Sequence, residues 1–157
     1  MIQRIQSLYL ALAVISMCFA LNAPLAEFTA GAVNVKMTAL GYERFGQPAL
    51  PQPDHAIHLP WGILALTIVL IALSAYILLQ YKNRIKQIML CNVSVAVHVF
   101  YYITYIAYCY AFASREALHY SPGFYIILPV ASLVFTLLAR RGIKADEAKI
   151  RAADRIR

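Results

Sequence analysis

Acidic residues are scarce in this chain. Seven Asp and Glu stand against 14 Lys and Arg in 157 residues, and none of the seven falls within the four long apolar runs described below. The sequence therefore lacks the paired carboxylates that general acid–base chemistry uses, and the intramembrane acids that a proton relay normally needs. It also shows no nucleophile with a neighbouring base and no glycine-rich nucleotide loop. We expect a protein that is not an enzyme, with no catalytic residue.

Residues that could bind a metal or form disulfides are also few. The three cysteines are Cys18, Cys91 and Cys109. All lie inside apolar runs, where a free thiol behaves as a small apolar side chain, and no Cys-x-x-Cys pair occurs. Asp54, His55 and His58 form the only metal-capable cluster, but the prolines around them favour an extended chain in which the histidines need not share a face. We expect no metal and no cofactor.

Apolar residues, in contrast, are abundant. They make up 62% of the chain, and the mean hydropathy is +0.65. A helix that crosses a hydrocarbon core about 30 Å thick needs about 20 mostly apolar residues. Four runs meet this requirement: Ile5–Ala23, Pro60–Tyr81, Ile88–Phe112 and Pro122–Ala139. We expect the first run to be retained as a span rather than cleaved as a signal peptide. Leu21 or Pro24 would occupy the position three residues from the cleavage site, which requires a small residue. The sequence predicts an all-α membrane protein, a four transmembrane helix bundle.

Basic residues are distributed unevenly between the two ends of these spans. When both termini and the Tyr81–Lys86 turn are placed on one side, that side holds eleven of the 14 Lys and Arg and the other side holds three. Cytoplasmic loops carry an excess of Lys and Arg, so we expect both termini in the cytoplasm.

The segment between the first two spans, residues 24–59, is the one long hydrophilic stretch. Apolar and polar residues alternate over Val33–Met37, as in a half-buried strand. Leu25–Thr29 can pair with this strand across Ala30–Ala32, which predicts a small extracytoplasmic hairpin. The proline-rich residues after Gly46 favour an extended link.

The third span carries a polar and aromatic face within Cys91–Phe112. Residues at alternating three- and four-residue steps share one face of a helix, and here they are Ser94, His98, Tyr101, Tyr105, Tyr108 and Phe112. Unpaired polar groups are costly in lipid, so this face should meet other helices or a wet cavity. We expect interhelical or ligand contacts from Asn92, His98, Tyr101, Tyr105 and Tyr108.

His98 is the only histidine within a span, and an ionisable residue in that position suggests a function. Proton transport lacks an acidic partner, and a bis-histidine haem lacks a second membrane histidine in the chain. We interpret His98 as hydrogen-bonded to a tyrosine, with contact to a ligand or quinone as the alternative. We likewise interpret the tyrosine face as helix or subunit packing, with a cofactor site as the alternative.

The fourth span is expected to start at Ser121 and Pro122, an N-cap followed by a first-turn proline. Pro129 predicts a kink or a freed carbonyl inside the span, available to a hydroxyl of the third span. Gly142 is expected to mark a joint, which divides the chain into a transmembrane unit, residues 1–142, and a cytoplasmic helical tail, residues 143–157.

The tail has a composition that favours helix, supported by ion pairs between Glu147 and Arg151 and between Asp154 and Arg157. Its basic residues would each attract anionic lipid by roughly 1 kcal/mol, although the interspersed acids dilute a pure lipid-binding patch. We interpret the tail as a solvated or lipid-associated helix, with docking onto a cytosolic or membrane protein as the alternative. Mixed charge without aromatic residues argues against nucleic acid. Residues expected to contact a partner or lipid are Arg140, Arg141, Lys144, Asp146, Glu147, Arg151, Asp154 and Arg155.

Both ends of the chain carry short distinctive motifs, MIQRIQSLYL at the start and IKADEAKIRAADRIR at the close. With four apolar runs and an outer loop between them, the chain resembles a family of uncharacterised integral membrane proteins of about this length, found chiefly in Bacteroidota. The resemblance implies a four-span protein of the bacterial inner membrane and assigns no activity.

These observations lead to a functional hypothesis, a non-enzymatic accessory or scaffold subunit of a larger inner-membrane assembly. Its partners would be other membrane proteins, contacted through the third span and the tail, and anionic lipids. The alternative is a small transporter, channel or ligand-binding protein with a cavity between the third and fourth spans, using His98, Tyr101, Tyr105 and Pro129. A membrane enzyme acting on lipid or quinone has no catalytic residues to support it.

Overall fold

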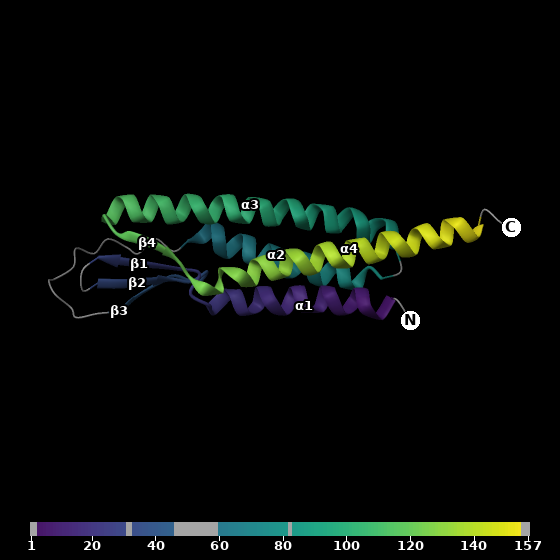
Figure 1. Cartoon of the computed structure of the whole chain (residues 1–157), viewed down its shortest axis with the longest axis horizontal. Helices are drawn as coiled ribbons and strands as arrows, with labels where there is room; N and C mark the ends of the chain where they lie inside the picture. Colours follow the sequence, from purple (N-terminus) through teal and green to yellow (C-terminus); the bar gives the residue numbers. More distant parts are fainter. Residues whose placement is uncertain (1–2, 31–32, 46–59, 82, 155–157) are drawn as a thin grey trace.

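Long antiparallel helices dominate the computed structural model, which describes residues 3–30, 33–45, 60–81 and 83–154 (Figure 1). The helices are α1 (Gln3–Asn22), α2 (Trp61–Leu79), α3 (Arg84–Glu116) and α4 (Ile127–Asp154). All four contain a stretch that is long and apolar enough to cross a membrane. The prediction of four such helices is confirmed, with α3 and α4 longer than the predicted spans.

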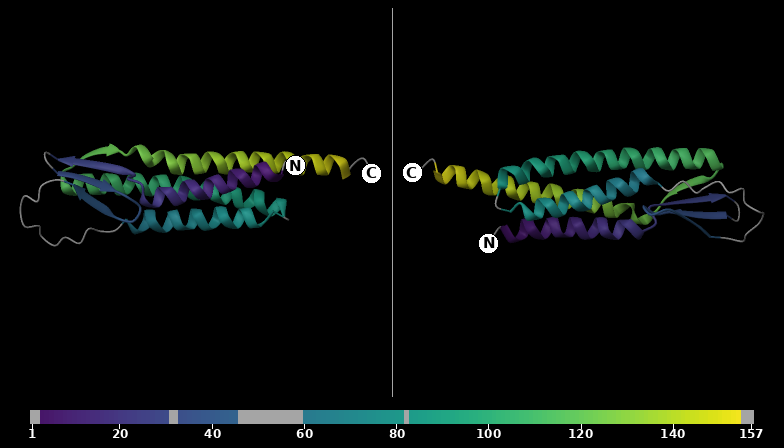
Figure 2. Two further views of the ribbon diagram at one scale, coloured as in Figure 1. Left: turned by 90° about the horizontal axis from the view of Figure 1, so that it is seen from below. Right: turned by 180° about the vertical axis from the view of Figure 1, so that it is seen from behind.

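The four helices run alternately up and down around one long axis. Helices α1 and α3 each pack against both α2 and α4, and therefore lie at opposite corners of the bundle (Figures 1 and 2). Both chain termini lie at one end of the bundle, and a small β-sheet lies at the other (Figure 1). The two ends of the molecule thus differ in structure: one carries the termini and the α2–α3 turn, and the other carries the sheet.

The predicted hairpin is present within a larger sheet. Strand β1 (Ala26–Ala30) pairs antiparallel with β2 (Val33–Met37), with Phe28 opposite Val35. Two further strands, β3 (Tyr42–Phe45) and β4 (His119–Pro122), complete an antiparallel sheet of order β3-β2-β1-β4. Strand β4 comes from the α3–α4 connection, so the sheet joins two interhelical segments that are distant in the sequence.

The predicted start of the fourth span is wrong. Ser121 and Pro122 belong to β4, where Ser121 pairs with Glu27. A 3₁₀ turn, η1 (Phe124–Ile126), precedes α4. Pro129 therefore lies in the first turn of α4, where a missing N–H interrupts no helical hydrogen bond. The kink and freed carbonyl expected within the span are also wrong.

The joint expected at Gly142 is wrong as well, because α4 runs through this residue as continuous helix. Gly142 instead lies against α1: a Cβ there would be 3.1 Å from Cγ of Gln6. One turn further on, Asp146 accepts a hydrogen bond from Nε2 of Gln6, and Ile143 is completely buried. The first turns of the tail therefore pack on the bundle.

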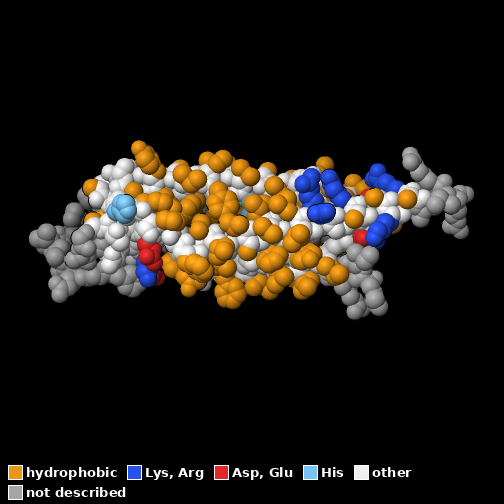
Figure 3. Space-filling model, in the orientation of Figure 1, with side chains coloured by type: hydrophobic (Ala, Val, Ile, Leu, Met, Phe, Trp, Pro, Cys, Tyr) orange, Lys and Arg blue, Asp and Glu red, His pale blue; other side chains and the backbone are white. Residues whose placement is uncertain are grey.

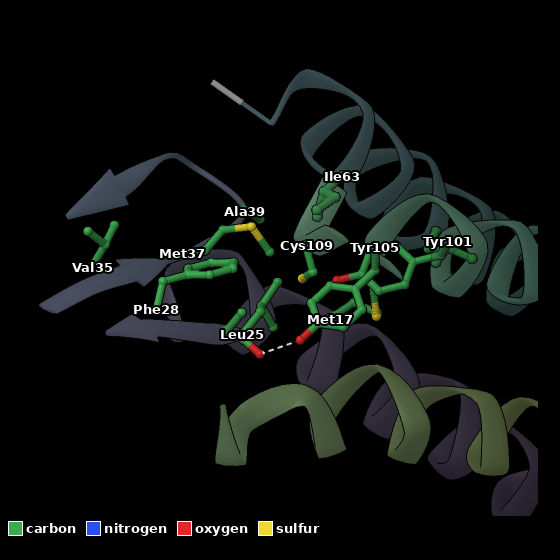
Figure 4. Packing of buried hydrophobic residues seen from close by; sticks show 12 residues of the cluster. Met17, Leu25, Phe28, Val35, Met37, Ala39, Ile63, Tyr101, Tyr105 and Cys109 are labelled. Carbon is green, nitrogen blue, oxygen red and sulfur yellow. Dashed lines mark hydrogen bonds between the residues drawn. The ribbon is translucent and has the colours of Figure 1, made fainter. Parts of the chain in front are cut away.

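The buried core forms two clusters along the bundle. The cluster nearer the sheet combines Met17 and Ile63 with sheet residues such as Phe28 and with Tyr101 and Tyr105 of α3 (Figure 4). A smaller cluster near the termini comprises Leu10, Ile77, Cys91, Ala139 and Ile143. Outside the core, apolar side chains also cover the middle of the helices on the face drawn in Figure 3. The predicted extended link after Gly46 and the cluster of Asp54, His55 and His58 lie outside the described residues.

Candidate functional site

Helix α3 brings His98 to the centre of the bundle, where the side chain is fully buried. Its Nδ1 lies 2.8 Å from the carbonyl oxygen of Ser94, and its Nε2 lies 3.2 Å from Oγ of Ser132 on α4. A carbonyl oxygen can only accept, so Nδ1 carries a proton, and in the neutral ring Nε2 accepts from the serine hydroxyl. The partner is therefore a serine of α4 rather than the expected tyrosine.

Buried hydroxyl groups lie inside the bundle on α2, α3 and α4. Thr67 Oγ1 on α2 donates to the Ile63 carbonyl at 2.7 Å, and Thr136 Oγ1 on α4 donates to the Ser132 carbonyl at 2.9 Å. Other buried hydroxyls have no hydrogen-bond partner within the described part of the chain: Ser74, Ser94 and Tyr102. The Tyr101 hydroxyl lies beside the Thr67 side chain. The centre of the bundle is thus more polar than its outer surface, and part of its hydrogen-bonding capacity is unused.

Nearer the sheet, the tyrosines of α3 hold other elements in place. The Tyr105 hydroxyl donates to the Leu25 carbonyl at 2.8 Å (Figure 4). The same hydroxyl lies 3.2 Å from the Tyr120 hydroxyl. The Tyr108 hydroxyl accepts a hydrogen bond from the backbone N–H of Gly62, at 3.3 Å, in the first turn of α2. This part of the polar face therefore links α3 to the start of the sheet and to the start of α2.

The sheet end also contains a compact aromatic cluster. The rings of Tyr42 and Phe112 stack with centroids 4.3 Å apart, and Phe28 meets Phe112 edge-on at 4.8 Å. Burial raises the pKa of Tyr42 to about 12, with smaller contributions from Cys109 and Tyr108. The neutral phenol is therefore the favoured form in the folded protein.

Asn92 is not brought into the polar face. It lies two residues before Ser94, which places it on a different side of the helix, and its side chain is exposed.

The tail residues are divided between contacts with the bundle and exposure. Asp146 faces α1, as described above, and Glu147 forms an ion pair with Arg151 at 3.0 Å. Arg140 is half-buried and has a buried Nε without a partner in the described residues, whereas Arg141 and Lys144 are exposed. The side chain of Asp154, the residue Arg155 and the proposed Asp154–Arg157 pair lie outside what the structure describes.

One family model matches almost the entire chain, over residues 2–156: a domain of unknown function, DUF4293. The chain belongs to this family. No curated protein matches it. Within the described part of this DUF4293 protein, no group of three or more His, Cys, Asp or Glu residues could hold a metal ion.

A basic pocket of this DUF4293 protein was missed by the sequence analysis. It has a volume of about 750 Å³ and lies between the α2–α3 turn and the C-terminal part of α4. Its lining residues are Tyr81, Asn83, Arg84, Ile85, Lys86, Glu147 and Ile150. The turn and the tail each showed their charge in the sequence. The turn and the tail lie side by side only because α4 continues as one helix past Gly142. The predicted joint at Gly142 left the position of the tail undefined.

Proposed function

We propose that this protein is a multi-pass protein of the bacterial inner membrane that serves as a non-enzymatic accessory or scaffold subunit of a larger assembly. Both termini and the C-terminal part of α4 lie in the cytoplasm, and the β-sheet lies on the outer side. Partners in the membrane bind the outer surface of the bundle, and cytoplasmic partners or anionic lipids bind the tail.

The distribution of side chains on the surface supports the membrane location. On the face drawn in Figure 3, apolar side chains occupy the middle of the helices, and Lys and Arg gather towards the end that carries the termini. A ring such as Trp61, 68% exposed at the start of α2, suits the boundary between lipid and water. The excess of Lys and Arg at the terminal end supports a cytoplasmic position for that end.

The observation that carries the proposal is the length of α4. A helix of 28 residues is about 42 Å long, whereas the hydrocarbon core is about 30 Å thick. Figure 1 shows that the C-terminal part of α4 extends past the end of the bundle. Exposed Lys149 and the Glu147–Arg151 pair lie on this part. A stiff charged helix projecting from an apolar bundle is suited to docking.

Native purification tests this proposal. The full-length protein is extracted gently into nanodiscs, and copurifying proteins are quantified over repeated preparations beside Lys144→Ala/Lys149→Ala. Thr29→Ala/Asn34→Ala, which removes two exposed side chains at the sheet end, serves as the matched control. Partners that recur, are lost with the tail variant and remain with the control support the proposal. A lone monomer without recurring partners contradicts it.

The Ser94 hydroxyl, one helical turn from His98 and without a partner in the described residues, favours a second candidate, a small transporter, channel or ligand-binding protein. Buried polar groups normally find partners, so the Ser94 hydroxyl would be free to bind water or a polar ligand between the helices. In that case His98→Leu abolishes uptake or binding and leaves protein abundance unchanged. If His98 serves packing, the same substitution lowers abundance.

A further inference from the structure

The basic pocket at the terminal end of the bundle has a strongly asymmetric charge. Arg84 and Lys86 contribute two positive charges from the first turn of α3, and that turn contains no acidic residue. Glu147 is the one acid in the lining, and Arg151 neutralises it through their 3.0 Å ion pair. The charge that remains unbalanced in the pocket is therefore positive, which favours an anion.

The same pocket is open to an apolar surface. Ile85 and Ile150 are part of its lining and are 65% and 42% exposed. One helical turn further along α3, Met89 is 67% exposed, and it leads from the pocket towards the apolar middle of the helix. A ligand that fits both parts has an anionic head and an apolar tail.

We propose that this pocket binds the phosphate headgroup of an anionic phospholipid, with Arg84 and Lys86 as the cationic contacts and an acyl chain along Ile85 and Met89. The inference rests on the proposed membrane location, which puts the pocket at the cytoplasmic boundary of the hydrocarbon core. Its volume of about 750 Å³ accommodates a headgroup. Basic pockets between helices at this boundary are suited to such lipids. A bound lipid would connect the α2–α3 turn to the projecting part of α4.

Native mass spectrometry of the full-length protein with phosphatidylglycerol and phosphatidylcholine tests this site. The wild type should retain phosphatidylglycerol in preference to phosphatidylcholine, with saturable binding. Arg84→Gln/Lys86→Gln should weaken phosphatidylglycerol binding roughly 20- to 30-fold, the loss expected for two cations that each contribute about 1 kcal/mol. Lys36→Gln/Arg115→Gln, which removes the same charge at the sheet end of the molecule, should change binding less than about twofold.

Three results would overturn the assignment: equal retention of both lipids, equal weakening by the two double variants, or displacement of the lipid by inorganic phosphate at comparable concentration. The last would identify a site for soluble phosphate. Fractionation of the expressing cells separates this inference from the function on which it rests. Wild-type protein absent from the membrane fraction refutes the membrane location, whereas membrane protein without a preference for phosphatidylglycerol refutes the lipid site alone.

Discussion

The Tyr105 hydroxyl donates a hydrogen bond to the Leu25 carbonyl oxygen at 2.8 Å, and this contact fixes α3 to the point where α1 leads into the sheet. The backbone N–H of Gly123, just before η1 and α4, donates to the same oxygen at 3.0 Å. One carbonyl therefore joins three parts of the chain that are distant in sequence. This junction holds the sheet on the helical bundle.

Tyr105→Phe should destabilise the protein by about 1 kcal/mol, because Leu25 loses one of its two donors and keeps the other. The measurement is the thermal unfolding midpoint in detergent. Tyr110→Phe is the matched control on the same helix, since the Tyr110 side chain is 77% exposed. Equal effects of the two substitutions would show that the contact to Leu25 contributes nothing to stability.

Gly123→Ala should be far more damaging, because a Cβ at this position would lie 2.4 Å from the carbonyl oxygen of Pro24, a backbone atom that cannot move alone. We expect little folded protein, measured as the monodisperse fraction after extraction. Gly142→Ala is the comparison, since its Cβ would meet the flexible side chain of Gln6 at 3.1 Å. A Gly123→Ala protein as abundant as Gly142→Ala would contradict the close packing of this junction.

Tyr42 should make the folded state sensitive to alkali. Its pKa is raised from 10.0 to about 12 by burial, so folding favours the protonated phenol. The stabilisation is complete below pH 10, the unfolded value, and is lost as the pH rises towards 12. Unfolding curves of wild type and Tyr42→Phe should therefore diverge over this interval, with the wild type losing more stability. Parallel loss in both proteins would contradict the burial of Tyr42.

The sequence predicted the elements that depend on local pattern. Apolar run length placed the four helices, and the alternation over Val33–Met37 placed the first hairpin. Strand β4 was missed because its four residues, His119–Pro122, have no alternation of their own and form a strand only by pairing with β1. Ser121 and Pro122 were read as a helix start for the same reason: a local capping signal was overridden by a distant partner.

For the candidate contact residues of α3, the sequence likewise predicted the local feature, the shared helix face, but not the distant partners. Helical spacing correctly grouped His98, Tyr101, Tyr105 and Tyr108 on one face. It could not identify what each one meets, because Ser132 and Leu25 come from other elements. Asn92 fell outside this face because its position in the helix, rather than its polarity, decides where it points. The basic pocket forms because α4 is continuous through Gly142. Glycine weakens helices, so the sequence predicted a break there instead.

The proposed topology puts the sheet and the C-terminal part of α4 on opposite sides of the membrane, with the tail in the cytoplasm. A membrane-impermeant maleimide tests it directly in spheroplasts, using Thr29→Cys in β1 or Lys149→Cys in α4, both exposed positions, in a chain whose three native cysteines are replaced by alanine. With this topology, we expect labelling of Thr29→Cys in intact spheroplasts and of Lys149→Cys only after permeabilisation. The reverse pattern, or labelling of both in intact spheroplasts, would contradict it.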